Sequence, residues 1–163
     1  MNKMITELSE IKLVGITAVT SNAAEMNPET AKIEAVMQRF FAENLQEKIT
    51  NKKTPGKIFA VYTNYESDAS GAYTYFLGEE VTSFDKNNEE FDTLIIPVQT
   101  YAKFTSNPGQ MPKVVIDMWQ NIWKMGVPDL SGDRAYIADF EIYDERSRDP
   151  SNAILDIYIG IKK

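Results

Sequence analysis

An internal repeat of short motifs constrains the fold more than any other feature of this sequence. The matches keep the same order and a near-constant spacing, which indicates a duplicated structural unit. Met37-Gln38 in the first helical segment also falls opposite Trp119-Gln120 in the second. The other matched segments are Val19-Thr20-Ser21-Asn22 with Phe104-Thr105-Ser106-Asn107, Val61-Tyr62 with Ile142-Tyr143, and residues 68–72 with residues 149–153.

Each copy has the pattern of a strand, a helix and a hairpin. Apolar side chains at helical spacing predict one helix from Pro28 to about Ile49, with Asn27 as its N-cap, and a second from Pro112 to near Gly126. Pro97 interrupts one β-like segment, and residues 127–133 are expected to be a loop. The segments with strand character are residues 11–20, 57–65, 72–81, 91–105, 134–144 and 153–162.

The order β-α-β-β followed by β-α-β-β predicts an α+β fold with pseudo-two-fold symmetry. We expect one domain over residues 1–163, with half-repeats at about 1–82 and 91–163. Two such halves create a cleft where they meet, and ligand sites favour such junctions. Residues that break the symmetry are therefore candidates for function.

Glu141 breaks the symmetry most clearly, because its repeat partner is Ala60. A carboxylate in the middle of an apolar strand is costly if it is buried without a partner. One interpretation is an acid on the floor of the cleft, with a raised pKa, that attracts a cation or transfers a proton. Strand alternation also allows the opposite: Glu141 on the solvent face together with Asp139, which the residues alone slightly favour.

Aromatic residues form the second candidate group. Trp119 and Trp123 are four residues apart and share one side of their helix, where the first helix has Met37 and Phe41. These side chains suit a cleft wall for flat apolar or cationic ligands, but such stripes are more often core. The same two interpretations hold for the 8 tyrosines, Tyr62 and Tyr101 among them, because strands favour aromatic residues.

The composition excludes several kinds of chemistry. The chain has no His and no Cys, so it cannot build Ser-His-Asp or Cys-His catalysis or a Cys-ligated metal centre. It lacks phosphate-binding glycine loops and EF-hand spacing, and we expect no metal and no cofactor. A net charge of −7 argues against nucleic acid as a partner. No signal peptide or apolar membrane span is visible, so we expect a cytoplasmic protein without membrane contact.

Several motifs resemble the gyrase-inhibitor-like effector-binding domains, which are related to ligand-binding domains of AraC- and MerR-type regulators and to integron-cassette binding proteins. The similarity covers nearly the whole chain, and the motifs occur in the order of the family. They are Val14-Gly15-Ile16-Thr17-Ala18-Val19-Thr20-Ser21-Asn22 for the first strand, residues 61–68 for the first hairpin, residues 111–124 for the second helix, and Asp139-Phe140-Glu141-Ile142-Tyr143 with residues 156–161 for the closing hairpin.

The resemblance implies a tandem β-α-β-β fold with a curved antiparallel sheet and two main helices flanking a central cleft. The family's cleft acid falls on Glu141, which reverses the preference for a solvent-facing position. Its aromatic walls fall on Trp119 and Trp123, with Tyr62 and Tyr101 as contributors. Met37 departs from the Trp that related sequences often carry at this position. Regulator members of the family also carry a separate helix-turn-helix DNA-binding domain, for which we expect no room in this chain.

The expected function is therefore that of a stand-alone binder of bulky apolar, aromatic or cationic small molecules, acting in sensing or sequestration. One alternative is a cofactor-independent hydrolase of electrophilic compounds that uses Glu141 as acid/base. A second is a protein-interaction module that acts on a regulator or a topoisomerase, although the sequence shows no partner surface. The predicted ligand-binding residues are Glu141, Trp119, Trp123, Tyr62, Tyr101, Met37, Phe41 and Phe76.

Overall fold

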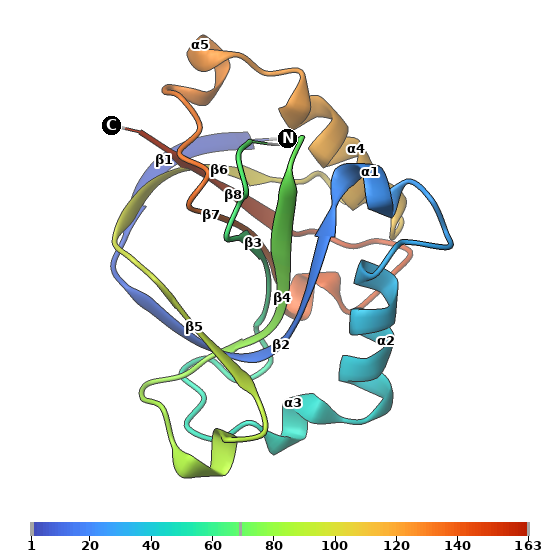
Figure 1. The fold of residues 1–163 in the computed structure, drawn as a ribbon. Helices are drawn as coiled ribbons and strands as arrows, with labels where there is room; N and C mark the ends of the chain where they lie inside the picture. The colour runs from blue at the N-terminus through green and yellow to red at the C-terminus, as the bar shows by residue number, and fades with distance from the viewer. Residues whose placement is uncertain (1, 69, 163) are drawn as a thin grey trace.

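The computed structural model describes residues 2–68 and 70–162, and its main element is one antiparallel sheet of eight strands (Figure 1). The strands are β1 (Asn2–Leu8), β2 (Ile11–Ser21), β3 (Ile58–Thr63), β4 (Ala72–Glu80), β5 (Asp92–Ile96), β6 (Gln99–Thr105), β7 (Ala138–Tyr143) and β8 (Asp156–Ile161). The helices are α1 (Asn22–Glu25), α2 (Ile33–Ala42), α3 (Leu45–Lys48), α4 (Lys113–Trp123) and α5 (Val127–Leu130), and Lys86–Asn88 and Glu145–Ser147 form single 3₁₀ turns.

The strand order of the sheet is symmetric about its centre, because each strand on one side has its repeat equivalent at the same place on the other side. The order is β1-β6-β8-β7-β3-β4-β2-β5, so the central pair is β7 with β3. In that pair Ala60 lies directly opposite Glu141, and these are the two residues that the sequence repeat equates. The pseudo-two-fold axis therefore passes through the position where the two halves differ most. The predicted α+β fold with a curved antiparallel sheet is confirmed.

The two edge strands are exchanged between the halves. The N-terminal strand β1 pairs with β6 of the second half, whereas β5 pairs with β2 of the first half. Sequence patterning had indicated no strand over residues 2–8. The reason is physical: β1 lies at an open edge and its side chains are mostly exposed, so it carries no buried stripe.

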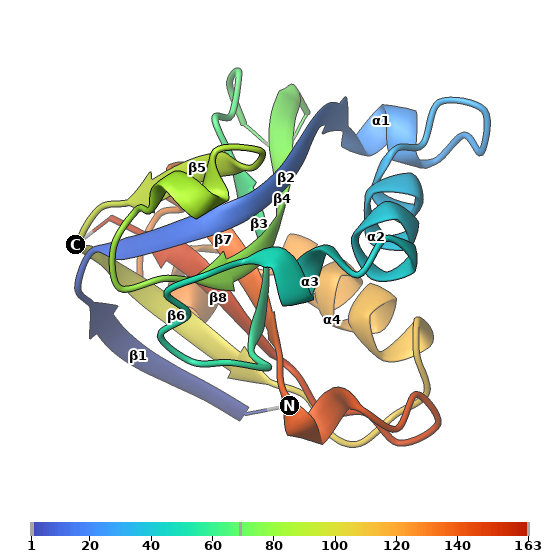
Figure 2. The same ribbon diagram turned by 90° about the horizontal axis from the view of Figure 1, so that it is seen from below.

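The two faces of the curled sheet have different coverings. Phe59 and Val61 of β3 point to one face, where they join an aromatic and aliphatic core enclosed by the curl of the sheet. Ala60 and Tyr62 point to the other face, as strand alternation requires. Helices α2 and α4 both lie on that second face (Figure 2). Among the described residues, no helix is long and apolar enough to span a membrane.

The first helical segment differs from the prediction of one helix that starts at Pro28. Ser21 caps the short α1 by accepting a hydrogen bond from the Ala24 N–H at 3.1 Å, whereas Asn27 lies in the turn that follows. Helix α2 begins only at Ile33, and Asn44, with φ of 50°, separates it from α3. The apolar spacing was interpreted correctly, but the turns that divide the segment depend on capping side chains, which apolar spacing does not reveal.

The second helical segment follows the prediction more closely. Helix α4 has Pro112 at its N-cap and ends at Trp123, three residues before Gly126. The predicted loop at residues 127–133 contains the one-turn helix α5, and the interruption at Pro97 separates β5 from β6. Strand β7 is shorter than expected, because residue 134 makes only an isolated bridge to Ile161.

Candidate functional site

A pocket of about 250 Å³ lies on the helical side of the sheet, at the junction of the two halves. The N-terminal ends of the first helical segments form one wall, α4 forms the opposite wall, and the first hairpin contributes the base. The lining residues are Asn22, Glu25, Ile33, Tyr62, Tyr65, Tyr73, Val115, Ile116, Trp119, Trp123 and Arg134.

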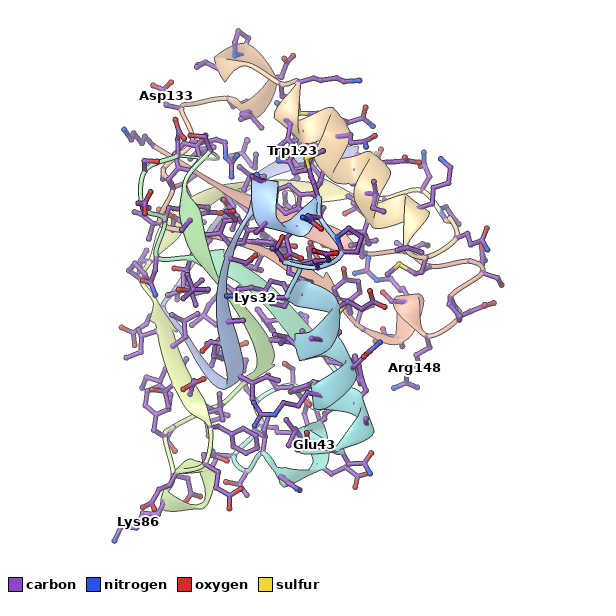
Figure 3. The ribbon with its side chains drawn as sticks, turned by 45° about the vertical axis from the view of Figure 1, so that its right-hand side comes forward. Lys32, Glu43, Lys86, Trp123, Asp133 and Arg148 are labelled. Carbon is purple, nitrogen blue, oxygen red and sulfur yellow. The ribbon has the colours of Figure 1, made fainter. Side chains whose placement is uncertain are left out.

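Helix α4 presents both tryptophans of the chain to this pocket. Met118 and Ile122 point into the core beneath the helix, and this orientation turns Trp119 and Trp123 toward the pocket. Trp119 is buried, whereas Trp123 is 52% exposed and lies at the mouth, where α4 faces α1 (Figure 3). Their ring centroids are 6.2 Å apart. Together they form a continuous aromatic surface from the mouth to the interior.

Tyrosines from the first hairpin continue this surface. The Tyr62 ring makes edge contacts with Trp119 at 5.2 Å and with Tyr73 at 5.5 Å between centroids. Tyr65 lies 6.0 Å from Tyr73. Edge-to-face packing of this kind holds the rings in fixed orientations. The base of the pocket is therefore a preformed aromatic platform whose hydroxyl groups point to defined partners.

Glu141 lies under this platform and is 1% exposed. Its Oε2 accepts hydrogen bonds from the Tyr62 hydroxyl at 2.7 Å and from the Trp119 indole N–H at 2.6 Å. Its Oε1 accepts a hydrogen bond from the Tyr143 hydroxyl. Tyr62 and Tyr143 are equivalent in the repeat, so each half supplies one tyrosine hydroxyl to the single acid, and Trp119 of the second half adds a third donor. The solvent-facing position that strand alternation allowed for Glu141 is thus excluded.

Glu141 differs from the other buried acids in the described part of the chain. Glu79, Asp139 and Asp156 each form an ion pair, with Lys52 at 3.3 Å, Arg134 at 2.6 Å and Arg146 at 2.6 Å respectively. The partners of Glu141 are all neutral. Burial raises the pKa of Glu141, and the three hydrogen bonds oppose this shift in part. When ionised, Glu141 is a buried negative charge with no cation beside it.

A second polar group borders the pocket at the other side of Tyr62. Asp139 is fully buried and accepts hydrogen bonds from Arg134 at 2.6 Å, from Tyr65 at 2.5 Å and from the Gly160 N–H at 2.8 Å. Burial and the Asp139 carboxylate raise the pKa of Tyr65 above its ordinary value. Tyr65 therefore stays protonated and acts as a donor.

Glu25 has a structural role at the pocket wall. Its carboxylate accepts hydrogen bonds from the backbone N–H groups of Lys32 at 2.7 Å and Ile33 at 3.2 Å, and from the Thr20 hydroxyl at 2.6 Å. Through these bonds it satisfies N–H groups at the start of α2. Glu25 thus fixes where α2 begins relative to the pocket.

The structure brings together only part of the predicted set of ligand-binding residues. Trp119, Trp123 and Tyr62 line the pocket and Glu141 lies directly beneath it. The other four side chains do not line it. The structure places Met37 partly buried on α2, Phe41 on the same helix and 52% exposed, and Tyr101 and Phe76 in the core on the opposite face of the sheet.

Strand parity explains two of these differences. Phe76 follows Tyr75, and Tyr75 already points to the helical face, so Phe76 must point away from it. Tyr101 precedes Ala102, which packs under α4, and so takes the opposite face as well. For Met37 and Phe41 the cause is their position along α2: the pocket meets the first residue of the helix, Ile33, and these two side chains lie one and two turns further along.

Some residues of the site had no clear signal in the sequence. Val115 and Ile116 lie one turn before Trp119 and could have been found from helical spacing. Tyr143 could have been found from its match to Tyr62. Arg134 and Glu25 had no comparable signal, because Arg134 lies outside the helices and strands and Glu25 lies on the one-turn helix α1, which has no apolar periodicity. Among the described residues, no group of three or more acidic side chains is arranged to hold a metal ion.

Comparison with known proteins identifies the family. Residues 4–161 match the family Cass2, described as integron-associated effector binding protein. The chain belongs to this family. It is 31% identical over 159 residues to YobU of Bacillus subtilis (strain 168), whose name describes a transcriptional regulator, and the match covers 98% of this chain and 97% of YobU. Effector-binding proteins of this family bind small molecules, and the resemblance drawn from the sequence is confirmed.

Solved structures agree with this assignment. The integron cassette protein VCH_CASS2 from the mobile metagenome of Vibrio cholerae is 30% identical, with a TM-score of 0.77 and coverage of 98% of this chain and 95% of that chain. SAV2435, solved bound to tetraphenylphosphonium, is 17% identical, with a TM-score of 0.77 and coverage of 99% and 94%. At that identity the second similarity establishes a shared fold for this effector-binding domain.

Proposed function

We propose that the protein binds aromatic or apolar organic cations in the pocket above Glu141. The observation that carries this proposal is the buried carboxylate whose hydrogen-bond partners are all neutral. A buried charge without a counter-ion is unfavourable, and a cationic ligand would supply one. The other buried acids already have a cation beside them, so they offer no such advantage.

The surroundings of Glu141 support the same class of ligand. Tyrosine and tryptophan faces attract cations and also stack on flat apolar groups. The pocket of about 250 Å³ is lined mainly by such rings and by aliphatic side chains. A net charge of −7 adds a long-range attraction for cations. The bulky apolar cation found in SAV2435, which has the same fold, supports this choice.

A panel of cationic aromatic dyes, each compared with a neutral compound of similar shape, tests the proposal. Both tryptophans of the chain line the pocket, so quenching of the intrinsic fluorescence reports on this site. We expect the cations to bind more tightly than the neutral compounds. If a folded sample shows no fluorescence change with any compound, the proposal is wrong.

Replacement of the acid gives a sharper test. Glu141→Gln should weaken the binding of cations about tenfold or more and leave neutral ligands nearly unaffected, because only the charged interaction is lost. Glu43→Gln is the matched control, since it removes one negative charge from an exposed position on the chain. Equal losses in both variants would show that the net charge, rather than Glu141, attracts the ligand.

A hydrolase of electrophilic small molecules is the second candidate. The observation in its favour is that two tyrosine hydroxyls contact a carboxyl group whose pKa is raised by burial. A protonated Glu141 could serve as a general acid in a chain that has no His. Turnover of an epoxide-type substrate by the wild-type protein, lost in Glu141→Gln, would favour this activity. Binding without turnover would favour the first proposal.

A further inference from the structure

The Arg134 side chain in the pocket wall has donors that the protein does not use. It lines the pocket and is 13% exposed. A guanidinium carries five N–H donors, and the hydrogen bond found for this one runs from Nη2 to Asp139. Its Nε is buried and has no hydrogen-bond partner among the described residues. Buried donors are normally satisfied, so the Arg134 guanidinium is under-used by the protein. Since Nε itself is closed to a ligand, the donors that a ligand can reach are the remaining N–H groups of the terminal nitrogens.

The guanidinium is held rigidly in this position. The Tyr136 ring packs against it, with the guanidinium carbon 4.4 Å from the ring centroid. Tyr136 has a φ of 53°, a left-handed conformation that is uncommon for an aromatic residue. A backbone bridge between Arg134 and Ile161 fixes the main chain. Unusual backbone conformations of this kind are often found where a side chain must be positioned for function.

The electrostatic setting of Arg134 differs from that of Glu141. The Asp139 carboxylate, 2.6 Å away, compensates the positive charge of the guanidinium. Arg134 therefore offers hydrogen-bond donors without a net charge that would repel a cationic ligand. A neutral oxygen acceptor suits such a group, because it needs no further charge balance.

We propose that the pocket recognises a second feature of its ligand, a neutral oxygen acceptor such as a carbonyl, held by Arg134. The proposal rests on the proposed function, in which Glu141 attracts the cationic end. Glu141 and Asp139 lie two residues apart on the same face of β7, opposite to Phe140, so their Cα atoms are about 7 Å apart. The ligand class is thus an aromatic cation that carries a carbonyl or similar oxygen on the opposite side of one ring from the cationic group.

Two small probes that differ only in this oxygen test the proposal. They are N,N,N-trimethylanilinium and its 4-acetyl derivative, and isothermal titration calorimetry measures their affinities for the wild-type protein. We expect the acetyl compound to bind about tenfold tighter, as for a hydrogen bond to a charged donor. Equal affinities would overturn the role of Arg134 and leave the proposed function intact. If neither compound binds, both proposals are overturned.

A double variant identifies the responsible side chain. Arg134→Met combined with Asp139→Asn removes both charges at once, so no buried charge is left unpaired. We expect the acetyl advantage, measured as the ratio of the two affinities in the same variant, to fall to about one. An advantage that persists would overturn the proposal. If that double variant does not fold, Arg134→Leu combined with Asp139→Asn replaces it, since leucine also has no donor, and an advantage that persists there would equally overturn the proposal.

Discussion

At the scale of single residues, the ionisation of Glu141 depends on two opposed effects. Burial removes the carboxyl group from water and raises its pKa above the ordinary value of 4.5. Hydrogen bonds from Tyr143, Tyr62 and Trp119 stabilise the carboxylate and limit that rise. The pKa of Glu141 therefore lies above that of an exposed glutamate, and the charge of this group is sensitive to what occupies the pocket.

This balance predicts a pH-dependent affinity for cations. Because the pKa of Glu141 is raised, the neutral acid is present at acidic pH and the carboxylate forms as the pH increases. A cation binds the carboxylate better, so the affinity for trimethylanilinium should increase with pH above the ordinary glutamate pKa of 4.5 and level off once Glu141 is ionised. Calorimetric titrations over this range measure the effect. Glu141→Gln should show no such increase, and an identical increase in that variant would contradict the prediction.

At the scale of elements, the sequence was informative wherever a segment buries one continuous face. The strand character of β2, β3, β4, β6 and β8 and the apolar spacing of α4 were read correctly for this reason. The first helical segment was misread because its boundaries depend on Glu25, a residue outside α2 that caps it. The periodicity of apolar residues does not contain that information, because Glu25 acts through hydrogen bonds across a turn.

The capping role of Glu25 leads to a prediction for α2. Glu25→Ala should lower the free energy of unfolding by about 1 kcal/mol, because two backbone N–H groups at the start of α2 lose their acceptor. Urea denaturation measures the change. Glu29→Ala is the matched control, since Glu29 is an exposed acid in the preceding turn and should alter stability little. Equal effects of the two substitutions would argue against the capping role.

At the scale of the whole molecule, the close approach of β2 and β4 accompanies the curl of the sheet. Gly15 and Gly78 lie opposite each other in this pair. A Cβ atom on Gly15 would lie 2.1 Å from the Leu77 carbonyl oxygen, and one on Gly78 would lie 2.1 Å from that of Val14. Since backbone atoms cannot yield as a flexible side chain can, the two strands require glycine at both positions.

Substitution of either glycine should therefore disturb the fold as a whole. We expect Gly15→Ala and Gly78→Ala each to lower the free energy of unfolding by more than about 2 kcal/mol, measured by chemical denaturation. Gly126→Ala serves as the control, because its Cβ would lie at an ordinary 3.7 Å from Pro128. A small effect at Gly15, comparable to that at Gly126, would show that the sheet can adjust at this point.

The sequence by itself determined the duplicated β-α-β-β order, the asymmetry between Glu141 and Ala60, and the pairing of Trp119 with Trp123 on one helix face. These are local or periodic properties, and they follow from residue type and spacing. Only the tertiary structure decided that Tyr101 and Phe76 face away from the pocket and that Arg134 and Glu25 lie at its wall. The physical reason is that strand register and loop paths depend on contacts between residues far apart in the chain, which no local pattern encodes.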